Sequence, residues 1–167
     1  RSTEEVYGVD LVLAQIRVAR GEGLPVLSKP RGVAIEARVY AEDPARGFIP
    51  SPGVLRRYRP PTGLGVRVDT GFEEGDLISS QFDPLIAKVI AWGADRRLAA
   101  ARLANALDDL QLLIEGGSAN HRYLADLLRS ERFLAGTWDI QTLHPTPPPS
   151  PHHHHVATVS AAIDSFV

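Results

Sequence analysis

Cysteine and methionine are both absent from the 167 residues of this chain. Without cysteine, the sequence excludes a disulfide framework, a thiolate metal site and a cysteine nucleophile. The lack of methionine means that there is no initiator residue, so we expect a piece of a longer chain.

Lysine is scarce, and no apolar run is long. Arginine carries almost all of the positive charge, since Lys29 and Lys88 are the only lysines. The formal net charge of −2 gives no reason to expect a nucleic acid or an anionic membrane as partner. No apolar run approaches the roughly 20 residues that span a bilayer, and residues 1–10 lack a signal-peptide pattern. We therefore predict neither a nucleic-acid partner nor a membrane partner.

Several catalytic and nucleotide-binding motifs are missing as well. The sequence contains no GxxxxGK[ST], GxGxxG, GxSxG or HExxH pattern, so we expect no complete nucleotide site within it. Four consecutive histidines, 152–155, could hold a metal loosely. They lie in a low-complexity stretch without supporting residues, and we predict no metal site.

The remaining pattern predicts one domain with a sizeable core, because the chain is long enough and 44% hydrophobic. Residue periodicity predicts strands over 33–40, 54–60, 65–70 and 84–92, and helices over 9–20, 95–112 and 120–134. The first helix carries one apolar stripe that we expect to be buried, and Asn120 is the expected N-cap of the last. Since the strands form a block that most helices follow, we predict an α+β fold, an antiparallel β-sheet with flanking helices.

The C-terminal part has a different composition. Residues 144–155 are rich in proline and histidine, which favours an extended and poorly ordered linker. We therefore predict a domain over 1–143, a linker over 144–155 and a short tail over 156–167.

The predicted strand 33–40 places a glutamate and an arginine on one face. Glu36 and Arg38 are two residues apart, about 6.6 Å along a strand, and therefore point to the same side. One interpretation is a solvated ion pair, which is worth little. The other is an arginine aimed into a cleft, where it holds a small anion or stabilises a developing oxyanion.

Asp83 and Lys88 bracket the start of the most apolar strand. An aspartate before proline favours a turn, so Asp83 either caps that turn or pairs with an arginine across the sheet. If Asp83 caps the turn, the Lys88 side chain would extend along the edge of the sheet. The residues alone leave both alternatives open.

Three segments together resemble the C-terminal domain of biotin carboxylase. They are "TEEVYGVDLV" (3–12), "GVAIEARVYAEDPARGFIPSPG" (32–53) and "GVRVDTGFEEGDLISSQFDPLIAKVIAWGADRRLAAARLANAL" (65–107). The A-x-E-x-R-x-x-A-E-[DN]-P run followed by F-x-P-S-P-G is highly specific, and the D-P-x-x-A-K block agrees independently. The resemblance extends from about Ser2 to Leu143.

The resemblance implies roles for individual residues. Arg38 matches the arginine that contacts bicarbonate and biotin and stabilises the biotin enolate while CO2 is attached. Glu36 would support it, and Asp83 would lie near the same cleft, so we expect an Arg38–Asp83 ion pair that loosens when ligand arrives. Arg67 resembles an arginine at the family's homodimer interface, where Leu64 replaces a residue that is often aromatic.

The resemblance also implies cofactors and partners. Biotin would arrive on a carrier domain, and ATP and Mg would be bound by an ATP-grasp half of the same enzyme. Its V-E-H-P glutamate would lie just before Ser2, so the isolated chain is expected to be inactive. The implied partners are the ATP-grasp half, carrier and carboxyltransferase domains or subunits, and a second copy of the chain. The expected location is the cytoplasm.

The sequence has two other interpretations. A non-catalytic binding or assembly module that keeps the fold is one alternative, because Val33 stands where the family usually has histidine. The biotin carrier itself is disfavoured, since its A-M-K-M attachment motif needs methionine.

Overall fold

The structure is a computed structural model that describes residues 1–139. Its helices are α1 (Ser2–Tyr7), α2 (Leu11–Ala19), α3 (Arg96–Asp109), α4 (His121–Arg129) and α5 (Glu131–Leu134), with a short 3-10 helix at Pro44–Arg46. Its strands are β1 (Val33–Tyr40), β2 (Glu42–Asp43), β3 (Ile49–Pro50), β4 (Gly53–Arg59), β5 (Val66–Thr70), β6 (Leu77–Ile78), β7 (Leu85–Gly93) and β8 (Gln111–Ile114). The predicted linker and tail, and the predicted domain end at 143, lie outside the described residues.

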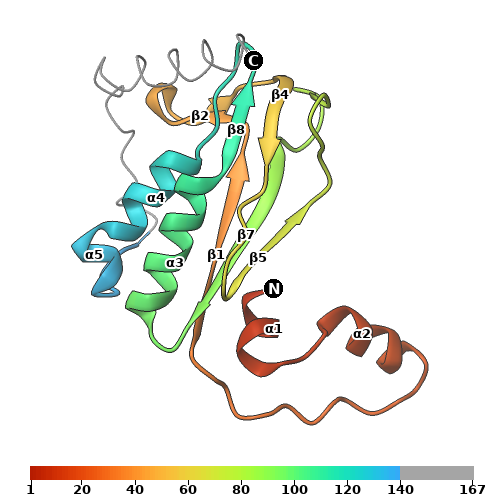
Figure 1. Cartoon of the computed structure of the whole chain (residues 1–167). Helices are drawn as coiled ribbons and strands as arrows, with labels where there is room; N and C mark the ends of the chain where they lie inside the picture. Colours follow the sequence, from red (N-terminus) through yellow and green to blue (C-terminus); the bar gives the residue numbers. More distant parts are fainter. Residues whose placement is uncertain (140–167) are drawn as a thin grey trace.

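The strands form antiparallel sheets, which confirms the predicted α+β class (Figure 1). The order of the main sheet is β1-β7-β5, with β7 in the centre. β4 belongs to a second sheet of order β6-β4-β8, and β2 and β3 form a short hairpin. The predicted helix 95–112 extends three residues past the C-terminal end of α3, because the chain becomes extended at Leu110 and β8 pairs with β4.

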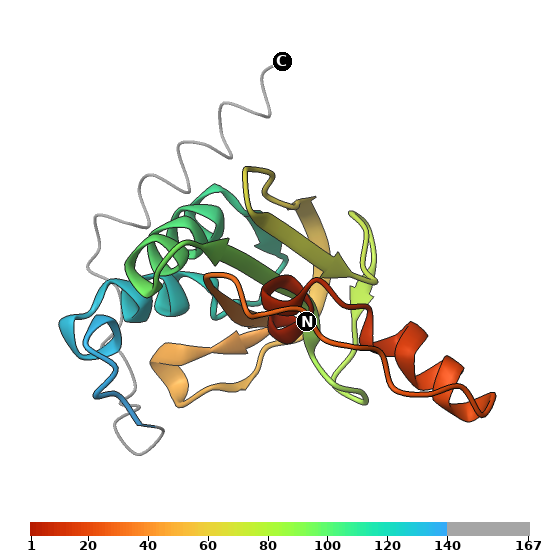
Figure 2. The same cartoon turned by 90° about the horizontal axis from the view of Figure 1, so that it is seen from below.

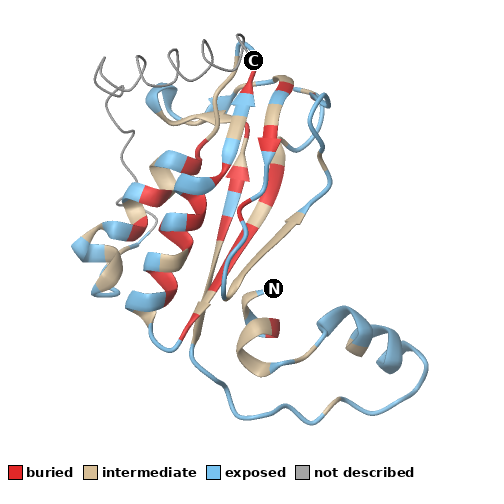
Figure 3. Ribbon diagram, in the orientation of Figure 1, coloured by how far each residue is buried: buried red, intermediate tan, exposed pale blue. Residues whose placement is uncertain are grey.

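One face of the main sheet is apolar and forms the core. Ala37 and Val39 of β1 lie opposite Val89 and Ala87 of β7, and all four are buried. Helix α3 packs on this face with a row of buried alanines and leucines, which Figure 3 shows in red. The small alanines allow α3 to approach the sheet closely. The larger side chains of Leu103 and Leu107 fill the space between the helix and the sheet.

The N-terminal segment is packed very differently. Helix α2 forms as predicted, and the Asp10 side chain caps it by accepting from the Leu13 N–H at 2.9 Å. The expectation of a buried stripe is wrong, because no residue of α2 is buried and Ile16 is 51% exposed. The connector that follows is exposed too, up to 99% at Val26. Figure 2 shows α2 projecting from the rest of the described chain.

Candidate functional site

The second face of the main sheet is charged. The register places Glu36 opposite Ile90, with Arg67 on the far side of Ile90. The next row places Arg38 opposite Lys88, with Asp69 on its far side. Directly opposed residues of antiparallel strands share a face, so these two rows form one surface, which we call the charged face.

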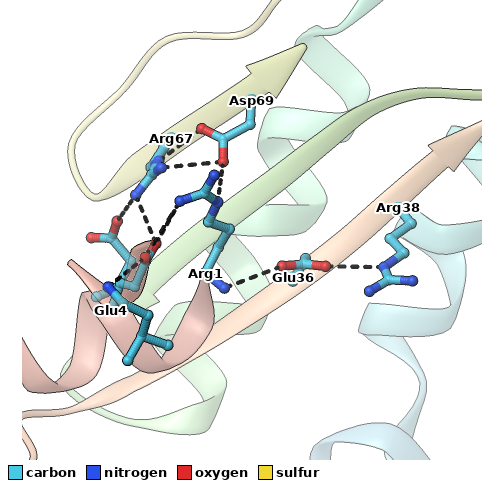
Figure 4. A network of polar contacts seen from close by, with 8 residues as sticks. Arg1, Glu4, Glu36, Arg38, Arg67 and Asp69 are labelled. Atoms are coloured by element: carbon cyan, nitrogen blue, oxygen red, sulfur yellow. Dashed lines mark hydrogen bonds and ion pairs between the residues drawn. The ribbon is translucent and has the colours of Figure 1, made fainter. Parts of the chain in front are cut away.

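Arg38 and Glu36 pair on the charged face, as the strand periodicity predicts. The Arg38 Nε donates to Glu36 Oε1 at 3.1 Å (Figure 4). The Arg38 side chain is 59% exposed and that of Glu36 is 17% exposed. The hydrogen bond to Glu36, with the neighbouring Tyr40 side chain, raises the pKa of Arg38 above its ordinary value. The guanidinium is therefore charged at every physiological pH and makes no ion pair with any other described residue.

Helix α1 closes one end of the charged face through Glu4, a residue that the sequence pattern does not single out. Its buried carboxylate accepts hydrogen bonds from Arg1 Nη1 at 3.1 Å, from Arg67 Nη1 at 3.5 Å and from the Leu11 N–H at 3.1 Å (Figure 4). Burial acts to raise the pKa of Glu4, but the bonds from Arg1 and Leu11 outweigh it and lower the pKa. The carboxylate thus holds α1 against the sheet as an anion.

Arg67 is engaged within its own chain. Its Nε and Nη2 donate to the two oxygens of Asp69 at 2.8 and 3.2 Å, and Nη1 donates to Glu5 at 3.2 Å. The side chain is still 39% exposed, and the nearby Leu64 is 84% exposed. The homodimer role of this region stays a prediction.

The expected ion pair between Arg38 and Asp83 is wrong for the described chain. Asp83 Oδ1 accepts the Leu85 N–H at 3.1 Å, which is the turn-capping alternative. The reason is local, because an aspartate bonds readily to the backbone two residues on, whereas Glu36 already faces Arg38 on the same strand. Asp83 does influence Glu42, whose pKa is raised by burial and then by the Asp83 charge.

Asn120 is the N-cap residue of α4, as predicted, but its side chain has another role. It precedes α4, but its side chain makes no cap hydrogen bond to that helix. It is buried, with 5% exposure, and bonds to the backbone of Arg38 and Tyr40 instead. Its sequence context reads as a helix start, and no local signal shows that a strand edge lies beside it.

Beside Asn120, His121 begins α4 and is buried, with 8% exposure. Its Nδ1 has no hydrogen-bond partner among the described residues. Burial, followed by the nearby Arg122 charge, lowers the pKa of His121 to about 4. His121 is therefore a neutral core residue at physiological pH.

Clusters of metal-binding side chains and long apolar helices are both missing from the described part of the chain. Residues 1–139 contain no group of three or more histidine, aspartate or glutamate side chains that could hold a metal ion. They also contain no helix that is long and apolar enough to cross a membrane. The charged face instead suits a small anion, which an arginine binds through paired N–H donors.

Comparison with known proteins decides the family. The family described as "Biotin carboxylase C-terminal domain" matches residues 36–145, which is more than half of the chain. The chain belongs to this family. Arg38 and Glu36 both lie within the matched segment of this biotin carboxylase domain.

Two curated relatives show the range of enzymes in which this domain occurs. The alpha subunit of mitochondrial methylcrotonoyl-CoA carboxylase from Oryza sativa is 45% identical over 141 residues, 82% of the chain and 19% of that protein. The biotin carboxylase of Pseudomonas aeruginosa is 41% identical over 144 residues, 84% of the chain. The chain spans only 31% of the latter's length.

A solved structure confirms the fold. The biotin carboxylase domain dimer of Hydrogenobacter thermophilus 2-oxoglutarate carboxylase, in complex with MgADP, ADP and bicarbonate, superposes with a TM-score of 0.80. The identity is 35%, covering 85% of this chain and 32% of that one.

Proposed function

We propose that this chain is the C-terminal part of a biotin carboxylase, which carboxylates biotin with ATP and bicarbonate. Arg38 is the observation that supports this function. It is charged, more than half exposed, and held by one carboxylate through Nε, so its two terminal nitrogens are free of ion pairs with described residues. A guanidinium in this state has donors ready for an incoming anion.

The chemistry of biotin carboxylation needs such a group. Biotin would supply a ureido nitrogen that accepts the carboxyl group, and the ureido oxygen gains negative charge as that nitrogen loses its proton. Arg38 would donate hydrogen bonds to bicarbonate and to this developing charge. Removing one such donor costs about 10²–10³ in rate in other enzymes. Glu36 would fix the direction of Arg38, because the two share one strand face and one hydrogen bond.

The partner that completes the site would be an ATP-grasp half. The apolar residues of α2 and the connector support this proposal, because they lie close together in the sequence and are exposed to solvent (Figure 3). They are Leu11, Val12, Leu13, Ile16, Val18, Leu24, Val26 and Leu27. Contiguous exposed apolar surface of this kind marks an interaction site. The chain covers 31% of the Pseudomonas aeruginosa biotin carboxylase and 32% of the Hydrogenobacter thermophilus domain, which leaves room for such a half.

Further partners follow from the same proposal. Biotin would be presented by a carrier domain, and a carboxyltransferase domain or subunit would use the product. A second copy of the chain would pack near Arg67, where Leu64 offers an exposed apolar contact. ATP and Mg would be bound by the ATP-grasp half.

An assembled enzyme tests the proposed function. We define it as this chain joined to the part of the Pseudomonas aeruginosa biotin carboxylase that precedes the matched region. The assay is formation of ADP that depends on free biotin and bicarbonate. We expect activity from the assembled enzyme and none from the chain alone. A folded assembled enzyme without activity would favour the alternative, a binding or assembly module that keeps the fold.

A further inference from the structure

The outer edge of β1 carries an unusual partner. Within the described chain β1 pairs with β7 only, so its other edge has no neighbouring strand. Asn120 occupies that edge with three hydrogen bonds. Its Oδ1 accepts the Tyr40 N–H at 3.0 Å, its Nδ2 donates to the Arg38 carbonyl at 3.3 Å, and its own N–H donates to the Tyr40 carbonyl at 3.1 Å.

These bonds act on the part of β1 that carries the charged face. On the inner edge, Arg38 lies opposite Lys88, but the register shifts just after Val39, which leaves Ile86 of β7 without an opposing residue. A bulge of this kind disrupts the ladder and twists the strand. Asn120 therefore supports the outer edge where the inner pairing is irregular.

Asn120 is itself held in place. It is 5% exposed, so its amide would be costly to bury without partners. Two residues earlier, the Ser118 N–H donates to Ser51 Oγ at 2.8 Å, and the Ser51 N–H donates to the Ala41 carbonyl at 2.8 Å. Ser118 thus ties the segment before Asn120 to Ser51, which itself bonds to the residue that follows β1.

We propose that Asn120 is a positioning residue for Arg38, an inference that rests on the proposed function. The Arg38 side chain is exposed and bends toward Glu36, so its own packing does not fix it. Besides the hydrogen bond to Glu36, its direction depends on the backbone from which it projects. Asn120 bonds to the Arg38 carbonyl and to the next residue on that edge, Tyr40, and so sets the angle at which the guanidinium enters the site.

The first test uses the 167-residue chain and NMR. Asn120→Ala should speed hydrogen exchange of the Tyr40 N–H about tenfold or more, and should change the Arg38 Nε–H signal. Asn105→Ala is the matched control, because Asn105 is the other asparagine and is exposed on α3. An unchanged Arg38 Nε–H signal in folded Asn120→Ala would overturn the inference.

A second variant covers the case in which Asn120→Ala does not fold. Asn120→Asp keeps an acceptor for the Tyr40 N–H but replaces the donor to the Arg38 carbonyl by an oxygen. We expect Tyr40 to stay protected while the Arg38 Nε–H signal moves. If both signals match those of the unaltered chain, Asn120 does not position Arg38.

The third test uses the assembled enzyme and a double-mutant cycle with Arg38→Gln. Asn120→Ala or Asn120→Asp should lower the carboxylation rate by up to about a hundredfold, as small misplacements do. In the Arg38→Gln background the same change should lower it no further. An equal loss in both backgrounds would show a purely structural role. If Arg38→Gln alone leaves the rate unchanged, the proposed function fails instead.

Discussion

The two faces of the β1-β7-β5 sheet are built from the same strands but differ in charge and in exposure. On one face Val39, Val89 and Ala91 are fully buried beneath α3. On the other, Arg38 is 59% exposed and pairs with a carboxylate. The apolar face therefore holds the domain together, whereas the charged face leaves Arg38 exposed. Substitutions on the two faces should separate stability from function.

The largest effect on stability is expected on the apolar face. Leu103 of α3 is 0% exposed, so Leu103→Ala should lower the free energy of unfolding by about 2–5 kcal/mol, since it leaves a cavity. Urea denaturation of the 167-residue chain measures this. Leu98→Ala on the same helix is the control, because Leu98 is 38% exposed. Equal losses in both variants would contradict the account of the core.

The next effect is a pH dependence that comes from the helical layer. The pKa of His121 falls from 6.5 to about 4 on folding, so the unfolded state binds more protons between these values. Stability should therefore fall as pH decreases from 6.5 to 4, by up to about 3 kcal/mol, and this contribution should level off below pH 4. Urea denaturation across this range measures it.

Two variants sharpen that test. His121→Gln should remove the dependence, because glutamine does not titrate. Arg122→Gln should weaken it, since the Arg122 charge is one cause of the lowered pKa of His121. A His121→Gln variant that keeps the full loss would show that other groups cause it.

A smaller effect is expected on the charged face. Glu36→Gln removes the carboxylate that pairs with Arg38, but that arginine is largely solvated, so the free energy of unfolding should fall by less than about 1 kcal/mol. The same variant should lower activity of the assembled enzyme, because Arg38 loses its orienting partner. A loss of stability like that of Leu103→Ala would mean that the charged face is part of the core.

The smallest effect is expected at α2. Ile16 is 51% exposed, so Ile16→Ser should change the stability of the isolated chain by no more than about 0.5 kcal/mol. In the assembled enzyme the same change should lower the melting temperature, since we propose that the ATP-grasp half covers this helix. Equal melting temperatures for assembled enzymes with and without the Ile16→Ser substitution would contradict that docking.

The sequence predicted the elements better than their surroundings. Strands β1, β5 and β7 and helix α2 were predictable, because periodicity and capping are local. The predicted helix 120–134 is divided into α4 and α5, because Ser130 is extended and caps the start of α5. The exposure of Ile16 was not, since an apolar stripe looks the same whether its partner is in the chain or outside it. β8 was missed because its pairing with β4 is non-local.

The candidate site divides in the same way. Glu36 and Arg38 share a face because they are two apart on one strand, and this was predicted from spacing. Asp83 was expected to reach Arg38, but its carboxylate bonds to the backbone of its own turn. Asn120 is the N-cap residue of α4, as expected, but its side chain bonds to a strand 80 residues away along the chain instead of to the helix. Such choices between local and distant partners are made by tertiary packing.

The most direct test of the central proposal compares Arg38→Gln with Arg56→Gln. Both arginines are exposed and paired with one glutamate, Arg38 with Glu36 and Arg56 with Glu115. We predict that Arg38→Gln lowers biotin carboxylation by the assembled enzyme about 10²–10³-fold while the chain unfolds at the same urea concentration, and that Arg56→Gln changes neither. Equal carboxylation rates for the two variants would contradict the account.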